Sequence, residues 1–242
     1  MNIEEEISCR CRQANIPLPV HAAAQIARYH QMLLAWNEWM DLTAVSEPEE
    51  MIDRLYVDSL TPLQIPGLIP VHAKVIDVGS GAGFPGLPLS IARPDLCITL
   101  LDAQQKRVRF LQAVIEELGL SNVKAIHGRA EDAARLPEYR EAFDLALARA
   151  VASMPVLLEF LLPFVKENGL SLCWKGPSAK EELPQAKRAA LLLGGELSAP
   201  VLTTIPGRDW AHVLIPCQKT EKTLRQYPRR SGIPGQKPLG GS

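Results

Sequence analysis

The sequence lacks any long apolar run, which limits what the chain can be. No stretch of its 242 residues approaches the roughly 20 consecutive apolar residues that a membrane helix needs. The first six residues, Met-Asn-Ile-Glu-Glu-Glu, are acidic and lack the basic and apolar regions of a signal peptide. The apolar fraction of 47% and the charged fraction of 22% are those of an ordinary globular protein. We therefore expect a cytoplasmic protein without a membrane partner.

Metal-binding patterns are also absent. The five cysteines include no pair of Cys-x-x-Cys units and the five histidines form no cluster, so the ligand spacings of a zinc site are missing. Cys9 and Cys11 are too close together to pair easily, and Cys97, Cys173 and Cys217 lie in apolar runs that are typical of strands. We expect reduced, mostly buried thiols and no metal.

Basic residues are outnumbered in most of the chain but dominate its C-terminal end. The whole chain has a net charge of −1, whereas residues 217–242 carry six lysines and arginines against one acidic residue. A basic tail on an acidic body favours a polyanionic partner such as nucleic acid. A solvated, disordered tail explains the same composition, and charge alone does not decide between the two.

Residues 1–70 carry no strand pattern and are predicted to form an N-terminal helical cap. Apolar residues recur at helical spacing over residues 22–40. Ser46 and Glu49 match a capping box, which predicts a second helix that runs to about Leu60. The apolar face of the first helix consists of Ala22, Ile26, Tyr29, Leu33, Trp36 and Met40.

From Lys74 onward, strand-like and helix-like segments alternate. Such alternation predicts an α/β fold with a parallel sheet and right-handed crossovers. The last two strands are expected to form an antiparallel pair at the edge of this sheet. We expect a mostly parallel seven-stranded sheet with helices on both faces over residues 71–218, followed by a basic tail over residues 219–242. The expected strands span 74–78, 97–101, 123–127, 143–148, 169–174, 196–205 and 210–216, and the expected helices 87–92, 104–118, 154–165 and 179–193.

The most informative stretch is Val75-Ile-Asp-Val-Gly-Ser-Gly-Ala-Gly-Phe-Pro-Gly86. A strand ends there in a turn with glycine at every second position, and a helix follows. Glycine permits positive φ and the close approach of a ligand, while the free N–H groups of a helix start attract a negative group. A second strand ends about twenty residues later in Asp102, and an acidic residue there suits the two hydroxyls of a ribose. The pattern indicates a site for an adenosine-type cofactor.

Two kinds of cofactor fit this pattern. Counted from Gly81, the turn matches the dinucleotide fingerprint G-x-G-x-x-G, which keeps an NAD-dependent oxidoreductase as an alternative. In a dinucleotide site, however, the first glycine directly follows the strand. Here that residue is Gly79, and the third glycine position then falls on Phe84. Counted in this way, the turn resembles the first motif of class I S-adenosylmethionine-dependent methyltransferases, which have a Rossmann-like fold.

A closer resemblance rests on five segments in this order: Val78–Gly86, Asp102 with Lys106-Arg107, Gly128–Glu131, Ala148–Val151 and Tyr227–Arg230. Over about residues 32–238 the chain resembles the bacterial glucose-inhibited division protein B family. The resemblance implies methylation of guanine N7 in small-subunit (16S) ribosomal RNA, as naked RNA or in an assembling subunit. A non-catalytic RNA-binding module with this fold is the alternative. The resemblance implies S-adenosyl-L-methionine as cofactor, in a site lined by Gly79, Gly81, Gly83, Phe84, Asp102, Ala130, Glu131 and Arg149.

The chain departs from the family pattern at two positions in the cap. The family usually carries Asn-Leu-Thr where this chain has Asp41-Leu42-Thr43, and a histidine where this chain has Leu55. We expect these departures to affect RNA contacts rather than cofactor binding.

The chain also lacks the motifs of other nucleic-acid methyltransferases. It has neither Asn-Pro-Pro-Tyr nor Asp-Pro-Pro-Tyr for an exocyclic amine, and Arg149 stands where a pyrimidine enzyme carries Pro-Cys. Guanine N7 has a free lone pair, so catalysis can consist largely of holding it in line with the methyl group, and we expect no general base. Arg149 is expected to position the methionine carboxylate or an RNA phosphate. A salt bridge at the strand end is the simpler alternative.

Basic side chains must hold the RNA backbone. N7 faces the deep major groove of A-form RNA, so the target guanine should lie in a loop or leave its stack. Truncation after Lys219 should weaken RNA binding and flatten its salt dependence, while cofactor affinity stays unchanged. No dimer face is evident, so we expect a monomer. The predicted RNA-binding residues are Lys106, Arg107, Arg109, Lys175, Arg225, Arg229, Arg230 and Lys237.

Overall fold

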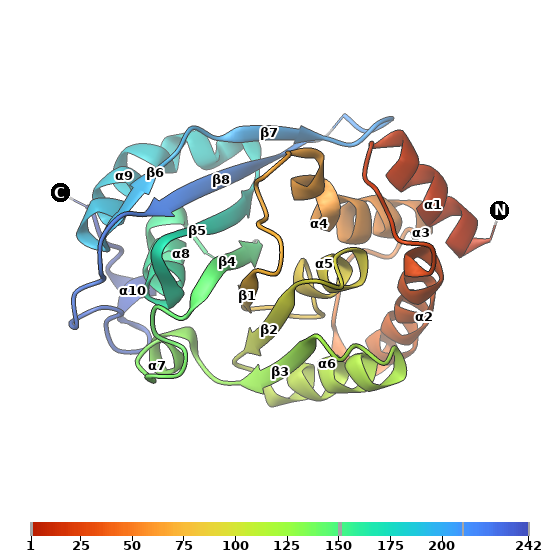
Figure 1. Ribbon diagram of the computed structural model, residues 1–242, viewed down its shortest axis with the longest axis horizontal. Coiled ribbons are helices and arrows are strands. Elements are labelled where there is room, and N and C mark those ends of the chain that lie inside the picture. The colour runs from red at the N-terminus through yellow and green to blue at the C-terminus, as the bar shows by residue number, and fades with distance from the viewer. Residues whose placement is uncertain (1, 150–151, 210, 242) are drawn as a thin grey trace.

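The chain folds around one eight-stranded sheet in a computed structural model, which describes residues 2–149, 152–209 and 211–241 (Figure 1). The strand order is β3-β2-β1-β4-β5-β8-β6, and β7 also pairs with β8. The first five strands run parallel, and β8 is antiparallel to its neighbours. The strands are β1 (Lys74–Val78), β2 (Cys97–Asp102), β3 (Val123–His127), β4 (Phe143–Arg149), β5 (Val165–Lys175), β6 (Gly195–Leu197), β7 (Val201–Thr204) and β8 (Ala211–Lys219).

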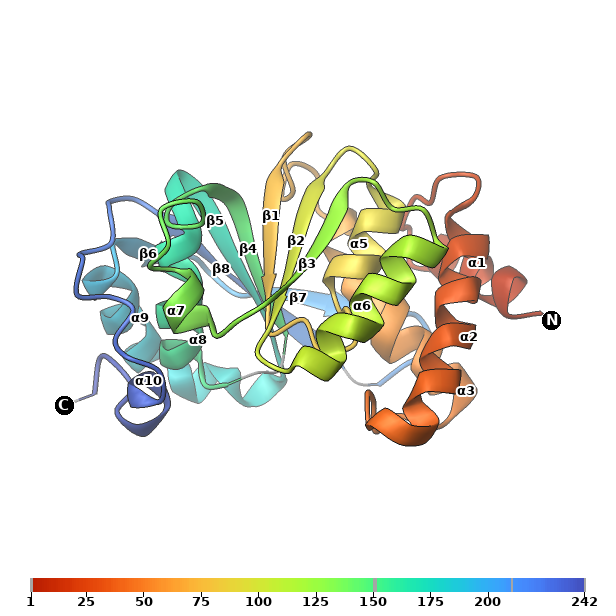
Figure 2. The same ribbon diagram turned by 90° about the horizontal axis from the view of Figure 1, so that it is seen from below.

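Helices cover both faces of the sheet (Figure 2). The α-helices are α1 (Ile3–Gln13), α2 (Ala22–Met40), α3 (Pro48–Met51), α4 (Asp58–Leu60), α5 (Gly86–Ala92), α6 (Gln105–Glu117), α7 (Ala130–Ala133), α8 (Met154–Leu161), α9 (Leu183–Leu192) and α10 (Ile233–Gln236). Alternate strand residues face opposite layers. Val75 and Leu100 pack with α2, α5 and α6, whereas Ile76 and Leu101 pack with α8 and α9. The predicted class of fold is confirmed.

The N-terminal helices share one apolar core with the sheet. Tyr29 and Leu33 of α2 lie in the same buried cluster as Val75 of β1 and Leu87 of α5. Helix α1 was not expected from the sequence, although Asn2 and Glu5 form a capping box at its start. A π-helical segment, Ile52–Val57, joins α3 to α4, so the chain stays helical from Pro48 to Leu60.

The expected capping box at Ser46 and Glu49 is wrong. The N-cap is Glu47, which makes no side-chain hydrogen bond, and Pro48 is the first helical residue. Proline suits that position because its missing N–H would have no helical partner there.

The expected number of seven strands is also wrong, because the strand predicted over residues 196–205 is two strands. β6 pairs with the end of β8 through Leu197 and Cys217, and β7 pairs with the beginning of β8. Pro200 lies between β6 and β7 and cannot donate to a sheet ladder. β5 begins at Val165, earlier than predicted. Trp210, at the start of the last expected strand, and residues 150 and 151 of the Ala148–Val151 segment lie outside the described residues.

The basic tail is folded against the body of the protein. Tyr227 and Pro228 are buried, and Leu239 packs against the apolar cluster of α8 and α9. Among the described residues, no helix is long and apolar enough to span a membrane, and no group of three or more His, Cys, Asp or Glu residues could hold a metal ion.

Candidate functional site

A cleft of about 540 Å³ opens at the carboxyl ends of β1, β2 and β4. The strand order reverses between β1 and β4, and open α/β sheets bind their ligands at such a point. A smaller cavity of about 200 Å³ adjoins the cleft and shares Gly79 and Ala103 with it. Of the predicted cofactor residues, Gly79, Gly81, Phe84, Asp102 and Arg149 line the cleft, and Gly79, Ala130 and Glu131 line the cavity.

The glycine turn after β1 takes a backbone conformation that other residues rarely adopt. Gly79, Gly81 and Gly83 have φ angles of +73°, +59° and +106°. The N–H of Gly79 donates to the carbonyl of Leu101 at 2.8 Å, which ties the turn to β2. A Cβ on Gly83 would lie 2.4 Å from Cδ1 of Leu87, so Gly83 packs inward against α5.

Asp102 is fixed at the tip of β2 by two backbone N–H groups. Its Oδ2 accepts from Gly81 at 2.8 Å, and its Oδ1 accepts from Gln104 at 2.8 Å. Nη1 of Arg107 lies 3.8 Å from Oδ2. A carboxylate oxygen can accept more than one hydrogen bond, so each oxygen retains capacity for a ligand hydroxyl. The glycine turn and the acidic tip therefore form one preorganised unit.

Asp77 lies buried beneath the same turn. Its Oδ2 accepts from the N–H of Gly86 at 2.9 Å, and its Oδ1 has no hydrogen-bond partner among the described residues. Burial raises the pKa of this carboxyl from 3.8 to about 7, against the lowering effects of the Gly86 N–H and of Arg149. Asp77 is a polar residue within the apolar strand β1, two positions before the first glycine, and this is the sequence signal that singles it out.

Arg149, the last residue of β4, is held in place by the cap. Its Nη1 donates to the carbonyl of Arg54 at 2.9 Å, to Oγ of Ser59 at 3.2 Å and to Oδ2 of Asp58 at 3.3 Å. The guanidinium lies 5.2 Å from the ring centroid of Phe84, a cation–π distance. Arg149 therefore makes a salt bridge and also lines the cleft.

Asp58 also links Arg149 to β5 and β8, the next two strands of the sheet. Its Oδ1 lies 2.7 Å from Nδ1 of His212 on β8, and its carbonyl accepts from Nε1 of Trp174 at 3.1 Å. Asp58 is 1% exposed. Sequence reasoning missed Asp58 and His212, because Asp58 lies 91 residues from Arg149 and 154 residues from His212 along the chain.

The two departures from the family pattern lie beside the cleft. Asp41 ends α2 with a φ of +49°, a left-handed conformation that asparagine and aspartate both tolerate. Oδ1 of Asn37 accepts the N–H groups of the next two residues, Leu42 and Thr43, which line the cleft. The change to aspartate therefore keeps the turn, whereas Leu55 places an apolar side chain in the cleft wall.

Three of the predicted RNA-binding residues lie at the start of α6, next to the cleft. Lys106 and Arg109 are exposed, and Nζ of Lys106 donates to the carbonyl of Met40 at 3.4 Å. Arg107 lines the cleft itself. Through Arg107, whose Nη1 lies 3.8 Å from Oδ2 of Asp102, this group adjoins the tip of β2.

The other predicted RNA-binding residues are more dispersed. Nζ of Lys175 forms an ion pair with Glu182 at 3.0 Å, and the side chain of Lys175 is only 12% exposed. Arg229 pairs with the fully buried Glu159. Arg225, Arg230 and Lys237 are exposed along the tail.

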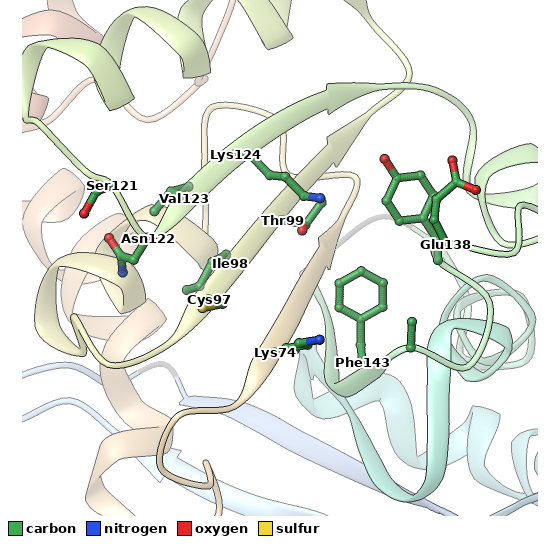
Figure 3. Close-up of a pocket in the computed structure, with 12 residues that line it drawn as sticks. Lys74, Cys97, Ile98, Thr99, Ser121, Asn122, Val123, Lys124, Glu138 and Phe143 are labelled. Carbon is green, nitrogen blue, oxygen red and sulfur yellow. The ribbon is translucent and has the colours of Figure 1, made fainter.

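Another cavity, of about 340 Å³, lies at the opposite end of the sheet (Figure 3). It is lined by the first residues of four strands, Lys74, Cys97, Val123 and Phe143. Nζ of Lys124 lies 5.5 Å from the ring centroid of Tyr139 there. The predicted cofactor residues belong to the other end of the strands.

Known proteins match this chain over most of its length. The family model GidB, described as rRNA small subunit methyltransferase G, matches residues 22–206. A protein named ribosomal RNA small subunit methyltransferase G from Alkaliphilus metalliredigens is 43% identical over 229 residues, 95% of each chain. A protein of the same name from Clostridium perfringens is 46% identical over 211 residues, 87% of this chain and 88% of its own.

Solved structures share the fold at low sequence identity. The [4+2]-cyclase SpnF has a TM-score of 0.54 and 16% identity, with 85% of this chain and 98% of its own covered. A putative methyltransferase from Bacillus halodurans has a TM-score of 0.50 and 14% identity, with 68% and 99% covered. The family match, the relatives and the cleft agree with the resemblance seen in the sequence. The chain belongs to the GidB family, whose model is described as rRNA small subunit methyltransferase G.

Proposed function

We propose that this chain transfers a methyl group from S-adenosylmethionine to guanine N7 in small-subunit ribosomal RNA. The observation that best supports this proposal is the unit formed by the glycine turn and Asp102. The chain is also 43% and 46% identical to two proteins named ribosomal RNA small subunit methyltransferase G. An NAD-dependent oxidoreductase is not favoured, because none of these relatives bears such a name. A module without catalytic activity is disfavoured by the intact unit of turn and carboxylate.

The residues present suit S-adenosylmethionine. Asp102 offers both carboxylate oxygens at the tip of β2, where a ribose would meet them. The smaller cavity beside Glu131 suits an adenine ring, and the larger cleft suits the methionine part next to Arg149. The unpartnered, buried Oδ1 of Asp77 shows that this end of the sheet is polar beneath the turn. When bound, the cofactor supplies a methyl group on a positively charged sulfur.

The chain contributes position rather than proton transfer. Guanine N7 presents a lone pair, so the protein has to hold the base against the methyl group and exclude water. Arg149 is suited to orient an anion, either the methionine carboxylate or an RNA phosphate, because three contacts fix its Nη1 and the ring of Phe84 lies beneath its guanidinium. Asp58 then acts as a positioning residue for Arg149.

The RNA is proposed to approach over α6. Lys106 and Arg109 are exposed at the start of this helix, and Arg107 lines the cleft. Arg225, Arg230 and Lys237 extend the basic surface along the tail, whereas Lys175 and Arg229 are proposed to contribute less because each is held by a carboxylate.

The proposed partner is small-subunit RNA or the assembling subunit. The proposed location is the cytoplasm, and the protein is proposed to act as a monomer.

Labelled methyl transfer tests the proposal. The protein is incubated with methyl-labelled cofactor and with unmodified small subunits or naked 16S RNA, and the label is followed into RNA. We expect incorporation into at least one substrate, and the better one identifies the physiological form. Thermal unfolding in parallel should show protection by S-adenosylhomocysteine and none by NAD. Protection by NAD alone, without label in RNA, would contradict the proposal.

A further inference from the structure

The C-terminal tail leaves the sheet in a fixed direction. Lys219, the last residue of β8, is 0% exposed. Its Nζ donates to the carbonyl of Leu162 at 2.8 Å and to Oγ1 of Thr223, and lies 3.4 Å from Glu141. A lysine is almost never buried unless it is paired in this way. The tail therefore starts as part of the folded body.

Two arginines of the segment after α7 then hold the tail by its backbone. Nη1 of Arg140 donates to the carbonyl of Tyr227 at 2.9 Å, and its Nη2 donates to that of Thr223 at 2.7 Å. Arg135 donates to the carbonyl of Pro228. These bonds join the tail to the segment that follows α7, the helix that contains Glu131.

Arg229 anchors the same stretch to α8. Glu159 is 0% exposed, and both of its oxygens are used: Nη2 of Arg229 lies 2.6 Å from Oε2, and Nε lies 2.9 Å from Oε1. The backbone N–H of Arg229 also donates to Oε1 at 2.8 Å. A bidentate pair of this kind fixes orientation as well as position. The neighbouring residue, Phe160, lines the smaller cavity.

Three residues later the tail contacts Glu131, which lines the smaller cavity. The N–H of Gly232 donates to Oε1 of Glu131 at 3.2 Å, and Glu131 is 5% exposed. Gly232 has a φ of +85°, which turns the chain back at this point. Among the described residues, the N–H of Gly232 is the only hydrogen-bond donor to this buried carboxylate, and we take it to orient the carboxylate.

We infer that residues 227–232 form a C-terminal strap that orients the Glu131 carboxylate and so sets the affinity for the cofactor. The inference rests on the proposed function, since it takes the cavity beside Glu131 as the adenine end of the cofactor site. It revises the expectation that loss of the tail leaves cofactor affinity unchanged. The strap makes the basic tail part of the cofactor site as well as of the RNA surface.

A pair of variants at one position tests the strap. Gly232→Pro removes the N–H donor, whereas Gly232→Ala keeps it and meets nothing within 4 Å of its Cβ. Alanine can adopt this positive φ with some strain, whereas proline removes the N–H and, because it fixes φ at about −65°, also moves the chain away from Glu131. The alanine variant is therefore the control for the loss of glycine alone. We expect the Kd for S-adenosylhomocysteine, measured by calorimetry without RNA, to rise about tenfold for Gly232→Pro and less than about twofold for Gly232→Ala.

A double-mutant cycle with Glu131→Ala shows whether the strap acts through that carboxylate, because alanine leaves no acceptor for the N–H of Gly232. In the Glu131→Ala background, Gly232→Pro should change the Kd by less than about twofold. A chain that ends after Arg230 keeps the pair of Arg229 with Glu159 and replaces Gly232→Pro in the cycle if that variant fails to fold. Equal Kd values for the proline and alanine variants, or an undiminished effect in the Glu131→Ala background, would overturn the inference. Failure of the unaltered protein to bind S-adenosylhomocysteine would instead overturn the proposed function.

Discussion

Replacement of Asp77 by asparagine should stabilise the protein, and increasingly so as the pH rises. The carboxyl is fully buried, one oxygen has no partner among the described residues, and burial raises its pKa from 3.8 to about 7. Asparagine has nearly the same shape, can accept from the N–H of Gly86 with its oxygen, and never becomes charged. The variant therefore removes the cost of a buried charge while keeping the contact with the turn.

The direction follows from the raised pKa. Below about pH 4 the carboxyl is neutral in the folded and in the unfolded chain, and its contribution to stability is fully present. Between about pH 4 and 7 the unfolded chain releases its proton while the folded chain keeps it, so the free energy of unfolding falls as the pH rises. A shift of about three units corresponds to about 4 kcal/mol, as an upper bound.

Urea unfolding of both proteins between pH 4 and 8 measures this effect. The stability of Asp77→Asn relative to the unaltered protein should rise by about 1.4 kcal/mol per pH unit up to about pH 7 and then level off. Asp144→Asn is a control of opposite sign. Although burial raises the pKa of Asp144, its hydrogen bond with Lys166 leaves that pKa lowered overall, so the charged carboxylate stabilises the unaltered protein above about pH 4. Asp144→Asn should therefore be less stable than the unaltered protein by an amount that stays nearly constant over the measured range and disappears only as the pH falls below about 4. A stability difference between Asp77→Asn and the unaltered protein that does not change with pH would show that the pKa of Asp77 is not raised by folding.

Three further predictions concern the turn, the carboxylate and the RNA surface. Gly83→Ala should destabilise the protein by more than about 2 kcal/mol in urea unfolding, because the new Cβ would lie 2.4 Å from the side chain of Leu87. Gly207→Ala is the control: Gly207 also has a positive φ, but its Cβ would meet open space, so the change should cost about 1 kcal/mol. Equal costs for the two variants would show that the contact with Leu87 does not matter. Asp102→Ala should weaken S-adenosylhomocysteine binding about 100-fold in calorimetry, because the ribose then has no charged acceptor for its two hydroxyls, and an unchanged Kd would remove Asp102 from the site. The double variant Lys106→Ala, Arg109→Ala should reduce the slope of log K for RNA against log salt by about 0.7 for each phosphate that the protein no longer neutralises, without change in cofactor affinity, and an unchanged slope would place the RNA elsewhere.

The elements that were predicted correctly are those whose signals are local. β1 and β3 have the predicted bounds, because each is a short segment that a glycine follows directly. The 22–40 helix also has its predicted bounds, since its apolar face repeats without interruption. Proximity of Asp102 to the glycine turn followed from the parallel topology, in which neighbouring strands end at the same edge.

The features that sequence reasoning missed depend on partners far apart in the chain. Asp58 meets Arg149 and His212 only because a π-helical segment and β8 converge on the end of β4. The basic composition of the tail predicts that Arg229 binds RNA, yet it pairs with Glu159, which lies 70 residues away and carries no signal of its own in the sequence. The division of the closing strand into β6 and β7 likewise depends on which half of β8 each segment meets.

The position of the transferred methyl group shows whether this chain methylates guanine N7 of small-subunit RNA. Unmodified small subunits are incubated with S-adenosylmethionine and either the unaltered protein or Asp102→Ala, and the RNA is then digested to nucleosides for mass spectrometry. We expect one new N7-methylguanosine per 16S RNA with the unaltered protein, and a yield at least about tenfold lower with the variant under limiting cofactor. A methyl group on another atom or base, or equal yields from the two proteins, would contradict this expectation.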